Sequence, residues 1–234
     1  MAENTKQKKK RDPQFTSPIG TFRYPHLQEP SYGSKEFPTP DGVYGLDLLL
    51  PQSEKATQDF IALLTPLHQE ALALGDQAFA ELPRASRDKL KQPVVHPLFN
   101  IDYDKETEEP TGNVVFKFKL KASGIYKSGV NQGKAWTAEP QIYDASGRRL
   151  FPRPAIWGGS TGRVSFSAAP FFMNATALTG ISTRMIGVQL FTLVAKGERS
   201  AESLGFGVLD DGYVTQDMTQ AEKIADTAVD TIDF

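Results

Sequence analysis

The sequence predicts a mainly-β protein, one small closed barrel that carries a single long helix between two of its strands. Three observations favour this class. Short apolar runs separated by turn residues recur through most of the chain. One segment, at about residues 53–82, instead repeats its apolar residues every three or four positions, as an amphipathic helix does. The length of 234 residues, with 39% hydrophobic and 23% charged residues, fits one domain with additional ends.

The first third of the chain is expected to hold an arm, two strands and the helix. Residues 1–14 are polar and basic and are predicted to form a flexible arm. A strand is expected near residues 20–24, followed by a loop, and a second strand at residues 43–50. Ser53 is the predicted helix N-cap, Pro66 is expected to kink or split the helix, and Pro83 to end it. A basic loop with Arg84 and Arg87 should follow.

The remaining strands are predicted from alternation and turn residues. Residues 114–121 alternate cleanly, with phenylalanine and leucine on one face and lysine on the other. Residues 141–143 precede a turn at 144–147, residues 155–166 predict a hairpin with a glycine-rich loop, and 185–195 predict a last strand. One helix among five to seven short strands fits an OB-fold barrel.

The charge is distributed unevenly along the chain. The net charge is -2, but residues 198–234 hold nine acidic and two basic residues, a net of -7, which leaves +5 for the rest. Residues 1–11 contribute +4 of that excess. We therefore expect a barrel domain at 15–197 and an acidic, largely disordered tail at 198–234. The pattern is typical of a polyanion binder that regulates itself, although two solubilising ends would give the same charges.

Several function classes find no support in the sequence. The absence of cysteine excludes disulfides and thiolate metal sites. No apolar run approaches the ~18 residues of a membrane helix, and the N-terminus does not resemble a secretory signal, so an intracellular protein is expected. The three histidines lie far apart without ligand spacing. We expect no metal, no cofactor and no catalysis.

Cations and aromatic rings supply the candidate binding residues. The stripe of Lys117, Lys119 and Lys121 could follow a phosphate backbone, or it could be an ordinary solvated sheet face. Bases of a single strand stack on flat side chains. The candidates for that role lie beside turns or small polar residues, and for each of them a place in the core is the alternative: Phe171, Phe172, Tyr126, Trp136 and Trp157. Arg163 is a further basic candidate, beside a glycine-rich loop that lacks the phosphate-loop pattern.

Ordered motifs then identify a family. The chain resembles the T7-type (podovirus) phage single-stranded DNA-binding proteins across residues 15–195 and at its acidic end. The matching pieces occur in the same order and are residues 15–21 (FTSPIGT), 32–33, 42–51, 116–119 (FKFK), 144–149 (DASGRR), 156–160 (IWGGS), 170–174 (PFFMN) and 232–234 (IDF).

The resemblance implies an OB-fold dimer that binds single-stranded DNA without sequence preference and without catalysis, in phage DNA replication, recombination and repair. By position, Lys117 and Lys119 match lysines of the family's binding strand, Phe171 stands at a tyrosine suited to stacking, and a basic-loop arginine corresponds to Arg87 or Arg84. The tail is expected to contact the phage DNA polymerase and helicase–primase and to compete with DNA. Its proposed contact residues are Asp226, Asp230, Asp233 and Phe234.

The resemblance also implies a place of action, the cytoplasm of the infected bacterium. Three alternatives remain open from the residues: an RNA-binding OB module, a non-catalytic interaction or virion protein, and a metal nuclease that uses Asp102 and Asp104.

Overall fold

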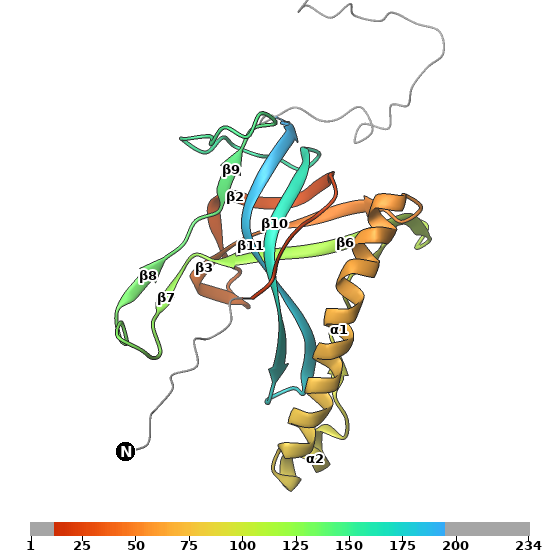
Figure 1. The fold of residues 1–234 in the computed structure, drawn as a ribbon, viewed down its shortest axis with the longest axis vertical. Helices are drawn as coiled ribbons and strands as arrows, with labels where there is room; N and C mark the ends of the chain where they lie inside the picture. Colours follow the sequence, from red (N-terminus) through yellow and green to blue (C-terminus); the bar gives the residue numbers. More distant parts are fainter. Residues whose placement is uncertain (1–11, 195–234) are drawn as a thin grey trace, which may run out of the picture. The chain divides into compact units, whose positions relative to one another are not determined.

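The computed structural model describes residues 12–194. Most of the predicted basic arm and all of the predicted acidic tail lie outside the described residues. The described part contains two helices and eleven strands (Figure 1): β1 (Gln14–Thr16), β2 (Gly20–Gly33), β3 (Pro38–Pro51), α1 (Lys55–Glu81), α2 (Arg84–Leu90), β4 (Val94–Val95), β5 (Asn100–Tyr103), β6 (Pro110–Lys121), β7 (Ser123–Ile125), β8 (Ala135–Thr137), β9 (Gln141–Tyr143), β10 (Thr161–Met173) and β11 (Leu178–Thr192).

Five long strands close into a barrel. They pair in the order β2-β3-β6-β11-β10, and β10 returns to β2 through the Thr161–Thr21 and Gly162–Gly20 pairs. All these pairings are antiparallel except that of β6 with β11. A five-stranded closed barrel with one long helical connection is OB-like, which confirms the predicted fold class.

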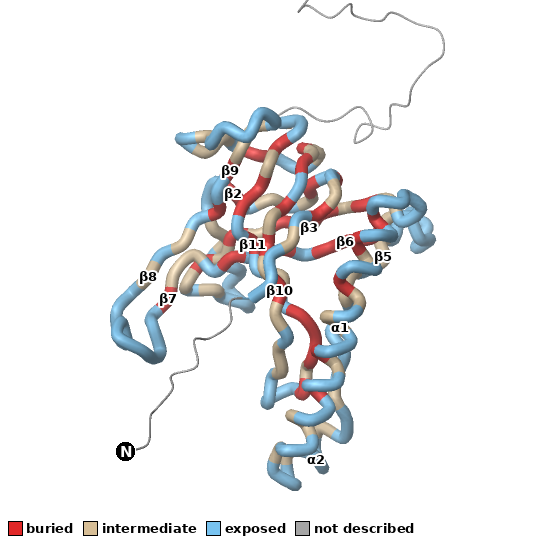
Figure 2. The backbone as a smooth tube through the Cα atoms, viewed as in Figure 1, coloured by how far each residue is buried: buried red, intermediate tan, exposed pale blue. Residues whose placement is uncertain are grey.

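The interior of the barrel is filled by side chains that point inward from every second position along the strands. Leu46, Leu48 and Leu50 of β3 are buried, and so are Phe116 and Phe118 of β6. Figure 2 shows this alternation as red and pale segments along the barrel strands. The predicted alternation is confirmed from Phe116 to Lys121, where the lysines of β6 face outward, whereas Val114, Val115 and Phe116 are all buried.

Helix α1 closes one end of this core. Its Phe60 ring lies 4.9 Å from the ring of Phe116 and 6.0 Å from that of Phe166 on β10. Farther along, α1 packs against the β10–β11 hairpin, which extends beyond the barrel beside the helix (Figure 1). At Gly75 an added Cβ would stand 2.1 Å from the Thr179 hydroxyl oxygen, so only glycine allows this close approach.

The predicted N-cap is wrong, and the split that was one of the two outcomes expected at Pro66 does not occur. The N-cap is Glu54, with extended backbone and no side-chain hydrogen bond, and Ser53 lies in the preceding turn. Pro66 does not split the helix, which is continuous from Lys55 to Glu81. Pro66 removes the hydrogen bond to the carbonyl of Ala62, but both residues lie on the exposed side, where water can satisfy that carbonyl.

Four further predictions need correction. The strand expected near residues 20–24 continues to Gly33, because its register irregularities accommodate Pro25 and Pro30. The hairpin expected at 155–166 does not form, since this segment bonds instead to Phe22 of β2, through the Phe22 N–H to Ser160 and the Gly159 N–H to Phe22. The basic loop expected after Pro83 is the helix α2. The last strand, predicted from residue 185, begins at Leu178.

Candidate nucleic-acid interface

The outward face of β6 carries three exposed lysines. Lys117, Lys119 and Lys121 alternate with buried phenylalanine and leucine, as predicted. Lys121 forms an ion pair with Asp41 at 2.6 Å, which reduces the charge it can offer to a ligand. Lys117 stands opposite Asp47 of β3 and Lys119 opposite Gly45.

The structure brings two of these lysines together with an aromatic ring. Lys117 and Lys119 line a hollow of about 270 Å³ with Phe171 of β10 and Arg184 of β11. Phe171 is partly exposed, and the His96 ring meets it edge-on at 5.8 Å between centroids. The hollow thus combines three cations with one flat apolar ring. Sequence-independent capture of a single strand needs these two chemistries.

Arg184 was not predicted from the sequence to be a site residue. The last strand was predicted to start at Met185, one residue later, so the arginine fell outside it. Its place at the site depends on the parallel pairing with β6, which sets Arg184 directly beside Lys119. In the structure Ser182, Arg184 and Ile186 are exposed and Met185 is buried, so Arg184 lies on the outer face of β11.

A continuous row of paired residues crosses the five barrel strands at this point. The row runs His26–Gly45–Lys119–Arg184–Ser167, from β2 through β3, β6 and β11 to β10. Adjacent strands are about 4.8 Å apart, so the row covers about 19 Å around the outside of the barrel. A second hollow of about 400 Å³ lies on the β2–β3 side of the row, and Lys119 lines both hollows.

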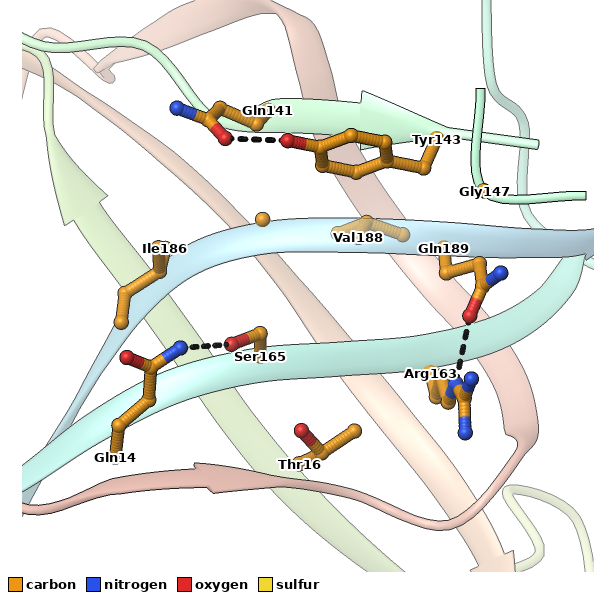
Figure 3. Close-up of a pocket in the computed structure, with 11 residues that line it drawn as sticks. Gln14, Thr16, Gln141, Tyr143, Gly147, Arg163, Ser165, Ile186, Val188 and Gln189 are labelled. Atoms are coloured by element: carbon orange, nitrogen blue, oxygen red, sulfur yellow. Dashed lines mark hydrogen bonds between the residues drawn. The ribbon is translucent and has the colours of Figure 1, made fainter. Parts of the chain in front are cut away.

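Arg163 lies apart from the two lysine hollows, in a groove of about 460 Å³ (Figure 3). Its Nε donates to Gln189 Oε1 at 2.8 Å, and the Gln189 amide nitrogen donates to the carbonyls of Asp144 and Ala145. The turn at 144–148 therefore holds the side-chain amide of Gln189 in position, and that amide in turn orients the Arg163 guanidinium. Within residues 12–194 the two terminal nitrogens of Arg163 form no hydrogen bond or ion pair, and Figure 3 shows its bond from Nε to Gln189.

The Asp144 carboxylate holds that turn together. It accepts hydrogen bonds from the Ser146 hydroxyl and the Arg148 backbone N–H, and these two bonds lower the pKa of Asp144 below its usual value. The turn predicted at 144–147 is confirmed.

The remaining basic and aromatic candidates do not join the hollow of Lys117 and Lys119. Arg84 and Arg87 are exposed on α2, where Arg84 pairs with Asp88 at 3.6 Å. Phe172 follows Phe171 on the strand, so its side chain points to the opposite face of the hairpin. The tail candidates Asp226, Asp230, Asp233 and Phe234 lie outside the described residues.

Three other aromatic residues have different surroundings. Trp136 packs over Gly124, whose added Cβ would stand 2.7 Å from the indole ring. Tyr126 is exposed beside the β7–β8 hairpin. Trp157 is half-exposed in a hollow beside His26, so its fluorescence is placed to report events near β2.

The two acidic residues considered for a nuclease are engaged in structural contacts. Asp102 pairs with Arg23 and accepts a hydrogen bond from Thr111. Asp104 caps a turn, and the backbone N–H groups of Thr107 and Glu106 lower its pKa. Within residues 12–194, no group of three histidine or acidic residues is placed to hold a metal ion. In the same range, neither helix is both long and apolar enough to cross a bilayer.

Comparison with known proteins identifies the family of the chain. The family model described as "Single-stranded DNA-binding protein, Bacteriophage T7" matches residues 20–193. The single-stranded DNA-binding protein of Enterobacteria phage T3 is 28% identical over 88% of this chain and 88% of its own length, and that of Escherichia phage T7 is 28% identical over 91% and 89%. The crystal structure of gp2.5, a single-stranded DNA-binding protein encoded by bacteriophage T7, superimposes with a TM-score of 0.61 at 25% identity, covering 78% of this chain and 93% of that one. The chain belongs to the family of the bacteriophage T7 single-stranded DNA-binding protein.

Proposed function

We propose that the chain binds single-stranded DNA without sequence preference across the outer face of β3, β6 and β11. The observation that carries this proposal is the convergence of Lys117, Lys119 and Arg184 with the Phe171 ring in one hollow. The family is one of DNA-binding proteins and not of enzymes, which accords with the expected absence of catalysis.

The position of the hollow on the barrel supports the same function. β3 and β6 are the second and third strands of the barrel, and the β2–β3 and β10–β11 hairpins flank them. In OB-folds this strand face and the corresponding two loops bind oligonucleotides. Phe171 comes from the β10–β11 hairpin, and the lysines come from the third strand.

Binding combines electrostatic capture with base stacking. The cations displace counterions from the strand, with a slope of about -0.7 in log affinity against log salt for each phosphate neutralised. One base then stacks against the Phe171 ring, and this stacking contributes about 1–3 kcal/mol to the binding free energy. Stacking on a protein ring requires an unpaired, accessible base, so it favours the single strand over the duplex.

Arg163 supplies a further phosphate contact in this proposal. Its guanidinium is already oriented by Gln189, and a fixed planar donor set suits a phosphate oxygen pair. Lys121 contributes less because of its ion pair with Asp41. A contribution from Arg84, Arg87 or Phe172 stays a prediction.

The proposal is tested by replacing Lys117 and Lys119 with alanine together. We expect weaker binding of labelled oligo-dT and a salt slope reduced by about 1.4, because two phosphate contacts are lost. Lys55→Ala with Lys105→Ala is the charge-matched control, since both lysines are exposed and neither lines the hollow. Equal losses in the two double variants would contradict this site. A matched ribo-oligonucleotide separates DNA binding from the RNA-binding alternative.

The acidic tail provides the partner-binding half of the proposed function. We propose that it recruits the phage DNA polymerase and helicase–primase during replication, recombination and repair in the cytoplasm of the infected host, and that it competes with DNA. The support is its net charge of -7, opposite in sign to the lysine face, and the family resemblance. Deleting residues from Leu204 onward should tighten DNA binding and abolish partner binding.

Two milder variants divide the roles of the tail. Phe234→Ala should weaken partner binding and leave DNA affinity unchanged. Replacing Asp226, Asp230 and Asp233 with asparagine should weaken the competition with DNA. Unchanged DNA affinity in the truncated protein would refute the competition. The family resemblance also supports a homodimer, which sedimentation equilibrium of the full chain would test.

A further inference from the structure

We propose that Tyr24 is a second base-stacking platform, on the far side of Lys119 from Phe171. The proposal rests on the proposed single-strand binding and extends its path across the barrel. Tyr24 lies on β2, is 60% exposed, and lines the hollow of about 400 Å³ that Lys119 also lines.

A β-bulge directs the ring outward. Arg23 pairs with Asp47 and His26 pairs with Gly45, so two residues of β2, Tyr24 and Pro25, stand opposite a single residue of β3. Tyr24 has a φ of +51°, a left-handed conformation that glycine adopts far more readily than a bulky residue. Bulges commonly re-aim a side chain next to a functional site. A tyrosine held in this position against its backbone preference indicates a role for its ring.

The neighbouring arginine holds the ring in place. The Arg23 guanidinium carbon lies 5.5 Å from the centroid of the Tyr24 ring. Arg23 is itself anchored by a hydrogen-bonded ion pair with Asp102 and by Asp47 at 3.8 Å. One face of the ring thus has a fixed cationic neighbour, and the ring can receive a base without losing much freedom. Arg23 also offsets part of the charge of Asp47, the acidic residue in this hollow, although it shares its own charge with Asp102.

The hollow adjoins the lysine site, because Lys119 lines both. Lys119 stands between the two, directly opposite Gly45. Because Gly45 has no side chain, nothing rises from β3 between His26 and Lys119 in the transverse row. A sugar–phosphate backbone can therefore pass across β3 at this point while its phosphate meets Lys119.

The spacing suits a short stretch of single strand. From β2 to β11 the row takes three strand steps, about 14 Å at about 4.8 Å each. Stacked nucleotides rise by about 3.4 Å, so about four of them cover this distance. Tyr24 would then hold a base at one end of a segment whose phosphates lie on Lys119 and Arg184, and Phe171 lies beyond Arg184, four residues past the row along β10.

The test measures the affinity of full-length Tyr24 variants for oligo-dT of two lengths. Tyr24→Ala should bind oligo-dT of about twelve nucleotides roughly 5- to 100-fold more weakly, and lose much less affinity for about three nucleotides, which reach one platform only. Tyr24→Phe should bind as the unchanged protein does. Tyr24→Gly should lose the same affinity as Tyr24→Ala while keeping the melting temperature, because glycine suits the positive φ.

Tyr103→Ala is the matched control. Tyr103 is 56% exposed on β5 and lines neither hollow, so its removal should leave the affinity unchanged. Full affinity in Tyr24→Ala and Tyr24→Gly would overturn the proposal, as would an equal loss in Tyr24→Phe. The Lys117 and Lys119 double variant tests the proposed function separately. If that variant binds oligo-dT normally, the proposed function is refuted. If it loses affinity while the Tyr24 variants keep theirs, only the Tyr24 proposal is refuted.

Discussion

At the residue scale, the site depends on how single side chains are held. Phe171 has the His96 ring at its edge, and His96 is fixed by its backbone N–H bond to the Thr179 carbonyl. Arg163 is fixed in the same indirect way by Gln189. Side chains that are oriented before the ligand arrives lose less conformational freedom on binding, so their contacts contribute more to affinity.

Replacing Phe171 with alanine should reduce affinity for oligo-dT by about 1–3 kcal/mol, with an almost unchanged salt slope, because a stacking surface and no cation is lost. Phe171→Tyr should retain the affinity, since the flat ring remains. Fluorescence anisotropy over a range of salt concentrations measures both quantities. A reduced slope in Phe171→Ala would show that the ring acts by placing the cations and not by stacking.

Arg163→Lys is expected to bind more weakly than the unchanged protein although the charge is kept. A lysine cannot take the guanidinium's bond to Gln189 and also present two parallel donors to a phosphate. The same anisotropy titration measures the loss, and Arg149→Lys provides a comparison at an exposed arginine outside the groove. Equal affinities for Arg163→Lys and the unchanged protein would mean that Arg163 acts as a simple charge or not at all.

At the scale of elements, local patterns predicted some parts of the site and missed others. The lysine face of β6 was predictable because strand alternation is a property of neighbouring residues. The bulge at Tyr24 was not, because Pro25 signals an interruption and only the pairing with β3 shows that the strand continues. The hairpin expected at 155–166 failed for the same reason, since β10 pairs with β11 and the preceding segment bonds to Phe22. The meeting of Lys119 with Arg184 depends on a parallel register between distant segments.

The contact between α1 and β11 gives a prediction with an unusual sign. In an exposed helix, Gly→Ala stabilises by about 1 kcal/mol. At Gly75 the new methyl group would collide with Thr179, so Gly75→Ala should instead destabilise the protein by about 1–3 kcal/mol. Urea denaturation followed by circular dichroism measures the change. Gly75→Ala combined with Thr179→Ala, which removes the hydroxyl oxygen and the methyl group nearest the new Cβ, should recover part of the loss relative to Thr179→Ala alone. A stabilised Gly75→Ala variant would contradict the close packing.

At the scale of the whole molecule, charge separation matters more than net charge. The net charge is only -2, yet three cations gather in one hollow while the residues from 198 onward carry -7. A polyanion therefore meets a locally positive face on a nearly neutral protein. Exposed charges farther apart than about 8 Å are largely screened at physiological salt, so the local arrangement determines binding.

Salt should consequently affect the full chain and the truncated chain differently. If the tail occupies the lysine face, added salt weakens the tail's contact as well as the DNA's, and the full chain should show a shallower salt slope than the chain that ends before Leu204. Titration of both proteins with the same oligo-dT at several salt concentrations gives the two slopes. Parallel slopes with equal affinities would indicate that the tail does not reach the site.

The long helix between β3 and β6 has a consequence for the speed of binding. The β10–β11 hairpin that carries Phe171 extends beyond the barrel, and α1 lies against it through the Gly75–Thr179 contact. A projecting hairpin without such a support would sample many orientations, and only some of them would bring the ring to the lysines. With the helix alongside, the competent arrangement exists before the encounter, so association can proceed without waiting for a rearrangement. If DNA binds at the proposed site, the inserted helix would therefore determine how often a collision with single-stranded DNA becomes a complex.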